Sequence, residues 1–120
     1  MTEEDAVRKF AEEYIKALNK GDTKWHLKNA DLKGMWEHNK EQMGESYTET
    51  EEEFAKSFKS GISLLGNKWD KKFTIKTITV TGDKADVEID AEGASSIGSP
   101  LKLSKASGQW KYIMGAVWFW

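Results

Sequence analysis

Apolar residues recur at helical spacing in three stretches of the chain, which predicts three helices. Each stretch begins at a residue that can cap a helix, and these residues are Thr2, Asp22 or Thr23, and Thr50. Each ends at a glycine, namely Gly21, Gly34 and Gly66. The core face of the first helix is expected to carry Val7, Phe10, Ala11, Tyr14, Ile15 and Leu18. The core face of the third helix is expected to carry Phe54, Phe58, Ile62 and Leu65.

The segment between the second and third predicted helices, GMWEHNKEQMGESY, favours a short hairpin. Met35 to His38 would form one arm, and Gln42 to Tyr47 the other. On this register, Trp36 and His38 share one face of the first arm, and Met35 and Glu37 share the other.

After Gly66 the apolar period changes to two residues, which predicts strands. Ile75 is out of phase with Ile78 and Val80, so we expect one extra residue near Lys76 and Thr77, as in a β-bulge. A turn is expected at residues 82–83. In the strand that follows, alternation predicts an inward-facing set of Ala85, Val87, Ile89 and Ala91. The outward-facing, solvated set is Asp86, Glu88 and Asp90. The outward acids can pair with Lys72 and Lys76. Two more strands are expected, one around residues 101–103 and one over residues 109–120.

The predicted element order is α-α-β-β-α-β-β-β-β, which is an α+β fold. No repeat or linker interrupts the pattern, so we expect a single domain over residues 1–120.

Composition narrows the classes of function. The formal net charge is −2 and the pI is about 5.7, which argues against a nucleic-acid partner. With no cysteine and two histidines, the chain is expected to hold no disulfide, metal or cofactor. No apolar run is long enough to span a membrane, and the acidic start does not resemble a signal peptide. We therefore expect a cytoplasmic protein without a membrane partner.

Lysine accounts for 17 of the 18 basic side chains, and Arg8 is the single arginine. This bias, with one proline and helix faces rich in Glu and Lys, is typical of designed or engineered chains, which are made recombinantly. A lysine-rich natural bacterial domain has a similar composition, so both origins stay open.

The last predicted strand divides its side chains into two sets by alternation. Lys111 prefers water, so the opposite set is expected to face the concave side of the sheet. That set is Trp110, Tyr112, Met114, Ala116, Trp118 and Trp120. It forms either ordinary core or the wall of a pocket for a flat apolar ligand. The other set exposes an apolar strip of Ile113, Val117 and Phe119, which suggests either an association surface or a strand end covered by a loop.

Three motifs, by their order and spacing, carry a resemblance to a known superfamily. They are IKALNKGD at 15–22, TEEEF at 50–54 and SGQWK at 107–111. On these motifs nearly the whole chain resembles the nuclear transport factor two-like superfamily, which includes ketosteroid isomerases, scytalone dehydratase and polyketide cyclases. The resemblance implies a curved antiparallel sheet wrapped around three helices as a cone with an internal pocket.

The resemblance also implies roles for particular residues. Ketosteroid isomerases carry a carboxylate base on the first hairpin strand, near where Glu37 or His38 falls here, although the family's Asp-Pro context is absent. Members of the superfamily commonly dimerise through the outer sheet face, so the strip of Ile113, Val117 and Phe119 suggests a homodimer.

Three functional hypotheses follow. The first is a protein that binds a small apolar molecule, polycyclic and steroid-like or aromatic, through Tyr14, Trp36, His38, Phe54, Phe58, Tyr112, Met114, Ala116, Trp118 and Trp120. The second is an isomerase or dehydratase that uses His38 or Glu37 as a general base. The third is a designed scaffold with no ligand and a small or collapsed cavity. His26 is expected on the surface, or alternatively at the mouth of the pocket.

Overall fold

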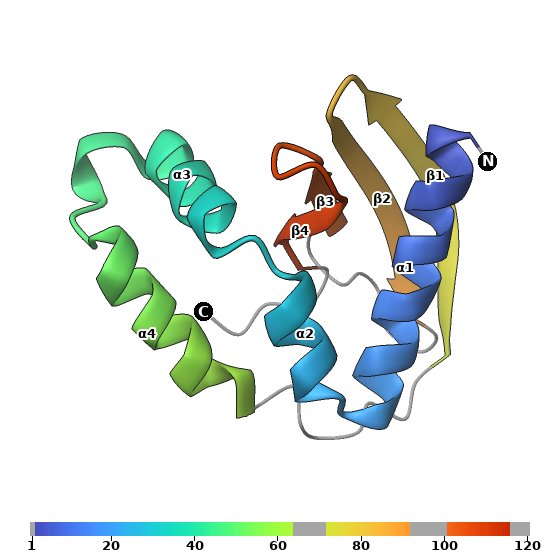
Figure 1. Cartoon of the computed structure of the whole chain (residues 1–120), viewed down its shortest axis with the longest axis horizontal. Coiled ribbons are helices and arrows are strands. Elements are labelled where there is room, and N and C mark those ends of the chain that lie inside the picture. The colour runs from blue at the N-terminus through green and yellow to red at the C-terminus, as the bar shows by residue number, and fades with distance from the viewer. Residues whose placement is uncertain (1, 64–71, 92–100, 116–120) are drawn as a thin grey trace.

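Helices precede an antiparallel sheet in the computed structural model, which describes residues 2–63, 72–91 and 101–115 (Figure 1). The helices are α1 (Glu3–Lys20), α2 (Thr23–Asn29), α3 (Leu32–Met43) and α4 (Glu51–Gly61), and a 3-10 turn, η1 (Gly44–Ser46), follows α3. The strands are β1 (Phe73–Thr81), β2 (Lys84–Ala91), β3 (Leu101–Ser104) and β4 (Lys111–Met114). The predicted α+β class with a curved antiparallel sheet is confirmed.

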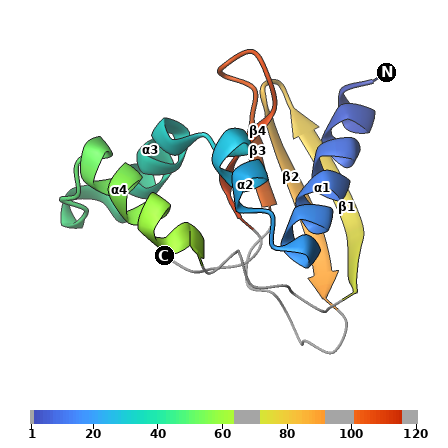
Figure 2. The same cartoon turned by 60° about the horizontal axis from the view of Figure 1, so that its bottom comes forward.

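α1 runs along the sheet and supplies much of the core, as Figure 1 and Figure 2 show. It begins at the predicted cap, because the Thr2 hydroxyl accepts a hydrogen bond from the backbone N–H of Asp5. It ends at Gly21, whose φ of 70° lies in the left-handed region. Its buried residues are Val7, Phe10, Ala11, Tyr14, Ala17 and Leu18. Within the described residues, no helix has the length and apolar character needed to cross a membrane.

The four strands pair in chain order, and each is antiparallel to the next. The register of β1 against β2 shifts between Ile75 and Thr77, so the predicted bulge is confirmed. The alternation predicted for β2 is also confirmed, because Ala85, Val87 and Ile89 are buried and Asp86, Glu88 and Asp90 are exposed. Lys76 pairs with Asp90 across the strands at 3.5 Å.

One row of side chains ties the sheet to the helices. Ala85 lies opposite Leu103, Leu103 lies opposite Tyr112, and all three are buried. Paired residues project to the same face of a sheet, so this row faces the core formed with α1 and α2. At the edge, the backbone N–H of Asp31 donates to the carbonyl oxygen of Tyr112 at 2.9 Å, which joins the start of α3 to β4.

The predicted hairpin of residues 35–47 is wrong, because α3 occupies most of that segment. Its apolar residues fit helical spacing, and no β-branched residue within α3 favours a strand. Asp31 decides the outcome locally. Its Oδ1 accepts a hydrogen bond from the backbone N–H of Gly34 at 2.9 Å and so caps a helix where the sequence pattern predicted that one would end.

The helix also separates residues that the hairpin would have placed on one face. Trp36 packs partly buried, and its indole N–H donates to the carbonyl oxygen of Glu49 at 2.8 Å. The Lys40 ammonium lies 5.0 Å from the centre of the same ring, within cation–π range. His38 instead lies between two cavities.

α3 lies against β4 at Gly34. A Cβ atom at this position would be 2.6 Å from Cγ2 of Ile113 and 2.7 Å from Oδ2 of Asp31. Ile113 is consequently buried, at 8% exposure. A close approach of helix backbone to strand side chain, and not an unusual φ, therefore requires glycine here. Beyond β4, α3 packs beside α4 (Figure 1).

Gly34→Ala is expected to lower the free energy of unfolding by about 1–3 kcal/mol, because the added methyl group overpacks the contact with Ile113. Helix propensity alone predicts the opposite, a gain of about 1 kcal/mol. Urea unfolding followed by circular dichroism measures the change. Lys33→Ala, at the exposed neighbouring position, is the control and should change stability by no more than about 0.5 kcal/mol. An alanine variant at position 34 as stable as the parent would contradict the contact.

Candidate functional site

Two of the predicted ligand-binding residues, Tyr14 and Tyr112, lie in the core. They are 2% and 1% exposed, and their rings meet edge to face with centroids 5.3 Å apart. Trp25 of α2 stacks on Tyr112 with an interplanar angle of 13°. Tyr14 and Tyr112 are therefore ordinary core residues and do not form the wall of a pocket.

His26 is fully buried in the same aromatic cluster, so its expected surface position is wrong. Its Nδ1 lies 3.2 Å from the Tyr112 hydroxyl oxygen, and its Nε2 has no hydrogen-bond partner among the described residues. Burial lowers the pKa of His26 to about 4, although the nearby Asp22 carboxylate opposes the shift. Burial also raises the pKa of the Tyr112 hydroxyl. Both side chains are therefore neutral at pH 7 and act as packed core.

A mostly apolar pocket of about 760 Å³ lies between α3, α4 and the end of β4. We call it the apolar pocket. It brings together four predicted ligand-binding residues, namely His38, Phe54, Phe58 and Met114. The two phenylalanine rings of α4 stack with centroids 6.5 Å apart. The volume is within the usual range of small-molecule sites, about 300–1,000 Å³.

The remaining residues of the apolar pocket did not emerge from the sequence, and they are Asn39, Gln42, Met43, Tyr47, Glu49 and Ser57. Most were missed because residues 35–47 were assigned to a hairpin. On a helix, positions 38, 39, 42 and 43 fall on one face, because 38 and 42, 39 and 42, and 39 and 43 are three or four residues apart. Recognition of Asp31 as a helix cap would have predicted that Asn39 and Gln42 share a helix face with His38.

His38 lies at the border of the apolar pocket and is half-buried. Its Nε2 is buried and has no hydrogen-bond partner in the described part of the chain. Burial lowers the pKa of His38, the cations Lys102 and Lys84 lower it further, and Glu41 and Asp86 oppose the shift. The imidazole is therefore mostly neutral at pH 7 and can accept or donate a hydrogen bond.

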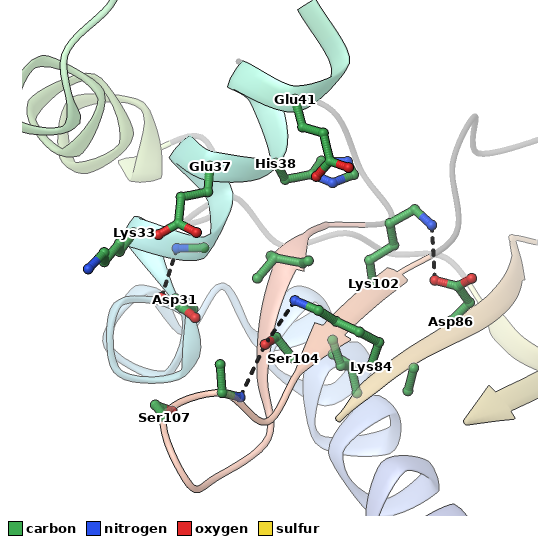
Figure 3. A pocket seen from close by; sticks show the side chains of 15 residues that line it. Asp31, Lys33, Glu37, His38, Glu41, Lys84, Asp86, Lys102, Ser104 and Ser107 are labelled. Carbon is green, nitrogen blue, oxygen red and sulfur yellow. Dashed lines mark hydrogen bonds and ion pairs between the residues drawn. The ribbon is translucent and has the colours of Figure 1, made fainter. Parts of the chain in front are cut away.

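A second cavity, the polar cleft, lies between α3 and the sheet on the face away from α1 (Figure 3). Its volume is about 550 Å³. α3 and its cap contribute Asp31, Lys33, Gly34, Glu37, His38 and Glu41, and the strands contribute Lys84, Asp86, Lys102 and Ser104. Glu37, the second candidate base, thus lines this cleft and is not part of the apolar pocket. In the described ranges, no three His, Asp or Glu side chains gather as metal ligands.

The other predicted site residues are dispersed. Trp36 lies on α3 and hydrogen-bonds to Glu49, and Ala116, Trp118 and Trp120 fall outside the described residues. Ile113 was expected to be exposed on the outer sheet face, and this is wrong because α3 buries it. Val117 and Phe119, the rest of that strip, also fall outside the described residues. A homodimer through the strip stays a prediction, without support from Ile113.

A family model described as putative lumazine-binding matches residues 2–118. Among the curated proteins and among the solved structures, no match was found. The family match covers almost the whole chain and therefore includes every described helix and strand.

The buried His26 makes stability fall in acid. Its folded-state pKa of about 4 lies below its ordinary value of 6.5, so the unfolded chain takes up the proton first. The contribution is complete above about pH 6.5 and is lost as the pH falls toward about 4. We expect about 2–3 kcal/mol of stability to disappear over this window.

Urea unfolding at a series of pH values tests this expectation, with His26→Phe as the matched variant. Phenylalanine keeps an aromatic ring but cannot be protonated, so His38 and the carboxylates account for the remaining pH dependence of the variant. The stability of the parent minus that of the variant should therefore fall as the pH is lowered from 6.5 to 4, because only the parent loses this contribution. Parallel curves over that range would show that His26 does not titrate on unfolding.

Proposed function

The chain belongs to the putative lumazine-binding family, and we propose that it binds a flat, ring-shaped small molecule in the apolar pocket. The family is of the nuclear transport factor two-like type, so the match and the resemblance in the sequence support the same kind of function. Membership of the family supports small-molecule binding in general. The residues of the apolar pocket support the narrower proposal of a flat, ring-shaped ligand.

The observation that carries the proposal is the division of the apolar pocket into a wall and an edge. Phe54, Phe58 and Met114 form an apolar wall suited to the face of a ring system. Asn39, Gln42 and His38 of α3 form a polar edge beside it, which a helical face places together. Apolar surface supplies affinity, and a few converging polar groups fix the orientation of a ligand.

This division favours a flat heterocycle over a wholly apolar steroid. Lumazine, the compound in the family's description, is a fused bicyclic heterocycle whose one edge carries carbonyl and N–H groups. The side-chain amides of Asn39 and Gln42 each offer both a donor and an acceptor to such an edge. A steroid would leave most of these polar groups without partners, which costs free energy when they are buried.

Calorimetric titration with lumazine tests the proposal, with a steroid as the apolar comparison. Ser57→Trp places a large ring in the apolar pocket and should weaken lumazine binding at least about tenfold, since it occupies the same volume. Ser60→Trp is the control, because Ser60 lies exposed on the same helix and does not line the pocket. Unchanged lumazine affinity in the position-57 variant, or tighter binding of the steroid, would argue against this ligand class.

One observation favours a second function, an isomerase or dehydratase that uses His38 as a general base. The imidazole is mostly neutral at pH 7, and its buried Nε2 has no protein partner within the described residues. A neutral imidazole at the border of an apolar pocket can abstract a proton next to a ligand carbonyl. The open pocket also does not favour the ligand-free scaffold, which predicts a collapsed cavity.

His38→Ala separates binder from enzyme. For an enzyme, the variant should keep its ligand affinity within a few-fold and lose turnover by about 10²–10⁴-fold, the usual contribution of a general base. Turnover is measured as exchange of the proton next to the carbonyl in a panel of cyclic ketones. A parent protein that exchanges no substrate proton leaves ligand binding as the function.

A further inference from the structure

The polar cleft is distinct from the apolar pocket, and among the described residues only His38 lines both. The floor of the polar cleft is the sheet face that carries Lys84, Asp86 and Lys102. These residues alternate along their strands with the core residues Ala85 and Leu103. Its opposite wall is α3 (Figure 3). Nothing in the proposed ring-binding function uses this cleft.

The floor of the cleft offers donors to an anion. The Lys84 ammonium lies 3.3 Å from the Ser104 hydroxyl oxygen, and it forms no ion pair within the described residues. The Lys102 ammonium is 3.0 Å from Asp86, and both of these side chains remain partly exposed to solvent. A carboxylate placed here would have Lys84 as a cationic partner that no acidic side chain of the described ranges neutralises.

Ser104 adds a buried donor beside Lys84. It is 2% exposed, and its hydroxyl oxygen accepts hydrogen bonds from the Lys84 ammonium and from the backbone N–H of Ala106 at 3.2 Å. The hydroxyl proton itself has no acceptor among the described residues. A buried hydroxyl rarely leaves its proton unused, and an anionic oxygen in the cleft would accept it.

The opposite wall carries the other charge. Glu37 and Glu41 lie four residues apart on α3, so they share one face of the helix. Within the described part of the chain, neither forms an ion pair with Lys84 or Lys102 across the cleft. A cavity therefore separates a helix wall that is acidic on balance from a strand floor that is basic on balance. The wall carries Asp31, Glu37 and Glu41 against Lys33, and the floor carries Lys84 and Lys102 against Asp86.

We propose that the polar cleft binds a small zwitterion, a molecule with one ammonium group and one carboxylate. The carboxylate accepts hydrogen bonds from Lys84 and Ser104 on the floor, and the ammonium pairs with Glu37 and Glu41 on the wall. A simple anion would leave the acidic wall unpaired, and a simple cation would leave Lys84 and the Ser104 proton unpaired. A zwitterion satisfies both walls at once, which gives the cleft selectivity for this class.

The chain contains two histidines, and they provide a built-in assay. His38 lines the polar cleft, and His26 is fully buried in the core, so the imidazole NMR signals serve as site reporter and internal reference. The probes are glycine, γ-aminobutyrate and ε-aminocaproate, which carry the two charges at increasing separation. Acetate and methylammonium carry one charge each.

At least one zwitterion is expected to shift the His38 signal and leave His26 unmoved, with a dissociation constant at least about tenfold below those of acetate and methylammonium. Lys84→Gln, and separately the double variant Glu37→Gln with Glu41→Gln, should each abolish that preference. Lys59→Gln removes one charge from an exposed position on α4 outside the cleft and should change nothing.

Three results would overturn the proposal. They are no shift of His38 with any zwitterion, acetate that binds as tightly as the best zwitterion, and a zwitterion preference that survives Lys84→Gln. Ser57→Trp, which fills the apolar pocket, should leave zwitterion binding intact. The two proposed sites therefore succeed or fail independently.

Discussion

The close contact between Gly34 and Ile113 determines where α3 lies, and both cavities depend on it. α3 supplies one wall of the apolar pocket and one wall of the polar cleft. Asp31 reinforces the same junction, because its backbone N–H bonds to Tyr112 and its carboxylate caps the helix. Protein interiors are packed densely, so a displacement of α3 at this point would alter both cavities together.

The two histidines illustrate how surroundings assign a role to a residue type. Each has a buried Nε2 with no partner among the described residues. His26 is enclosed by Tyr14, Trp25 and Tyr112, so its neutral ring contributes packing. His38 borders two cavities, so its half-buried ring lines space that a ligand can fill. The sequence did not show that His26 is a core residue and that His38 borders cavities, because the burial of a side chain depends on elements that are remote along the chain.

Much of the fold was predictable because its signals are local. The capping residue Thr50 marked the start of α4, and the phase change after Ile75 located the bulge. The hairpin failed at Gly34, which was taken as a helix stop. Its role is tertiary, since the missing side chain lets α3 approach Ile113. A glycine that ends a helix and one that permits a close contact look alike in a sequence.

The sequence by itself determined the α+β class, the boundaries of α1, the alternation in β2 and four of the residues that line the apolar pocket. These features follow from hydrogen bonds and periodicities that act over a few neighbouring residues. Only the tertiary structure decided that Tyr112 belongs to the core and that Ile113 lies beneath a helix. It alone placed Glu37 across a cleft from Lys84. Cavities form where distant elements meet, and their shape depends on side-chain packing that no local pattern encodes.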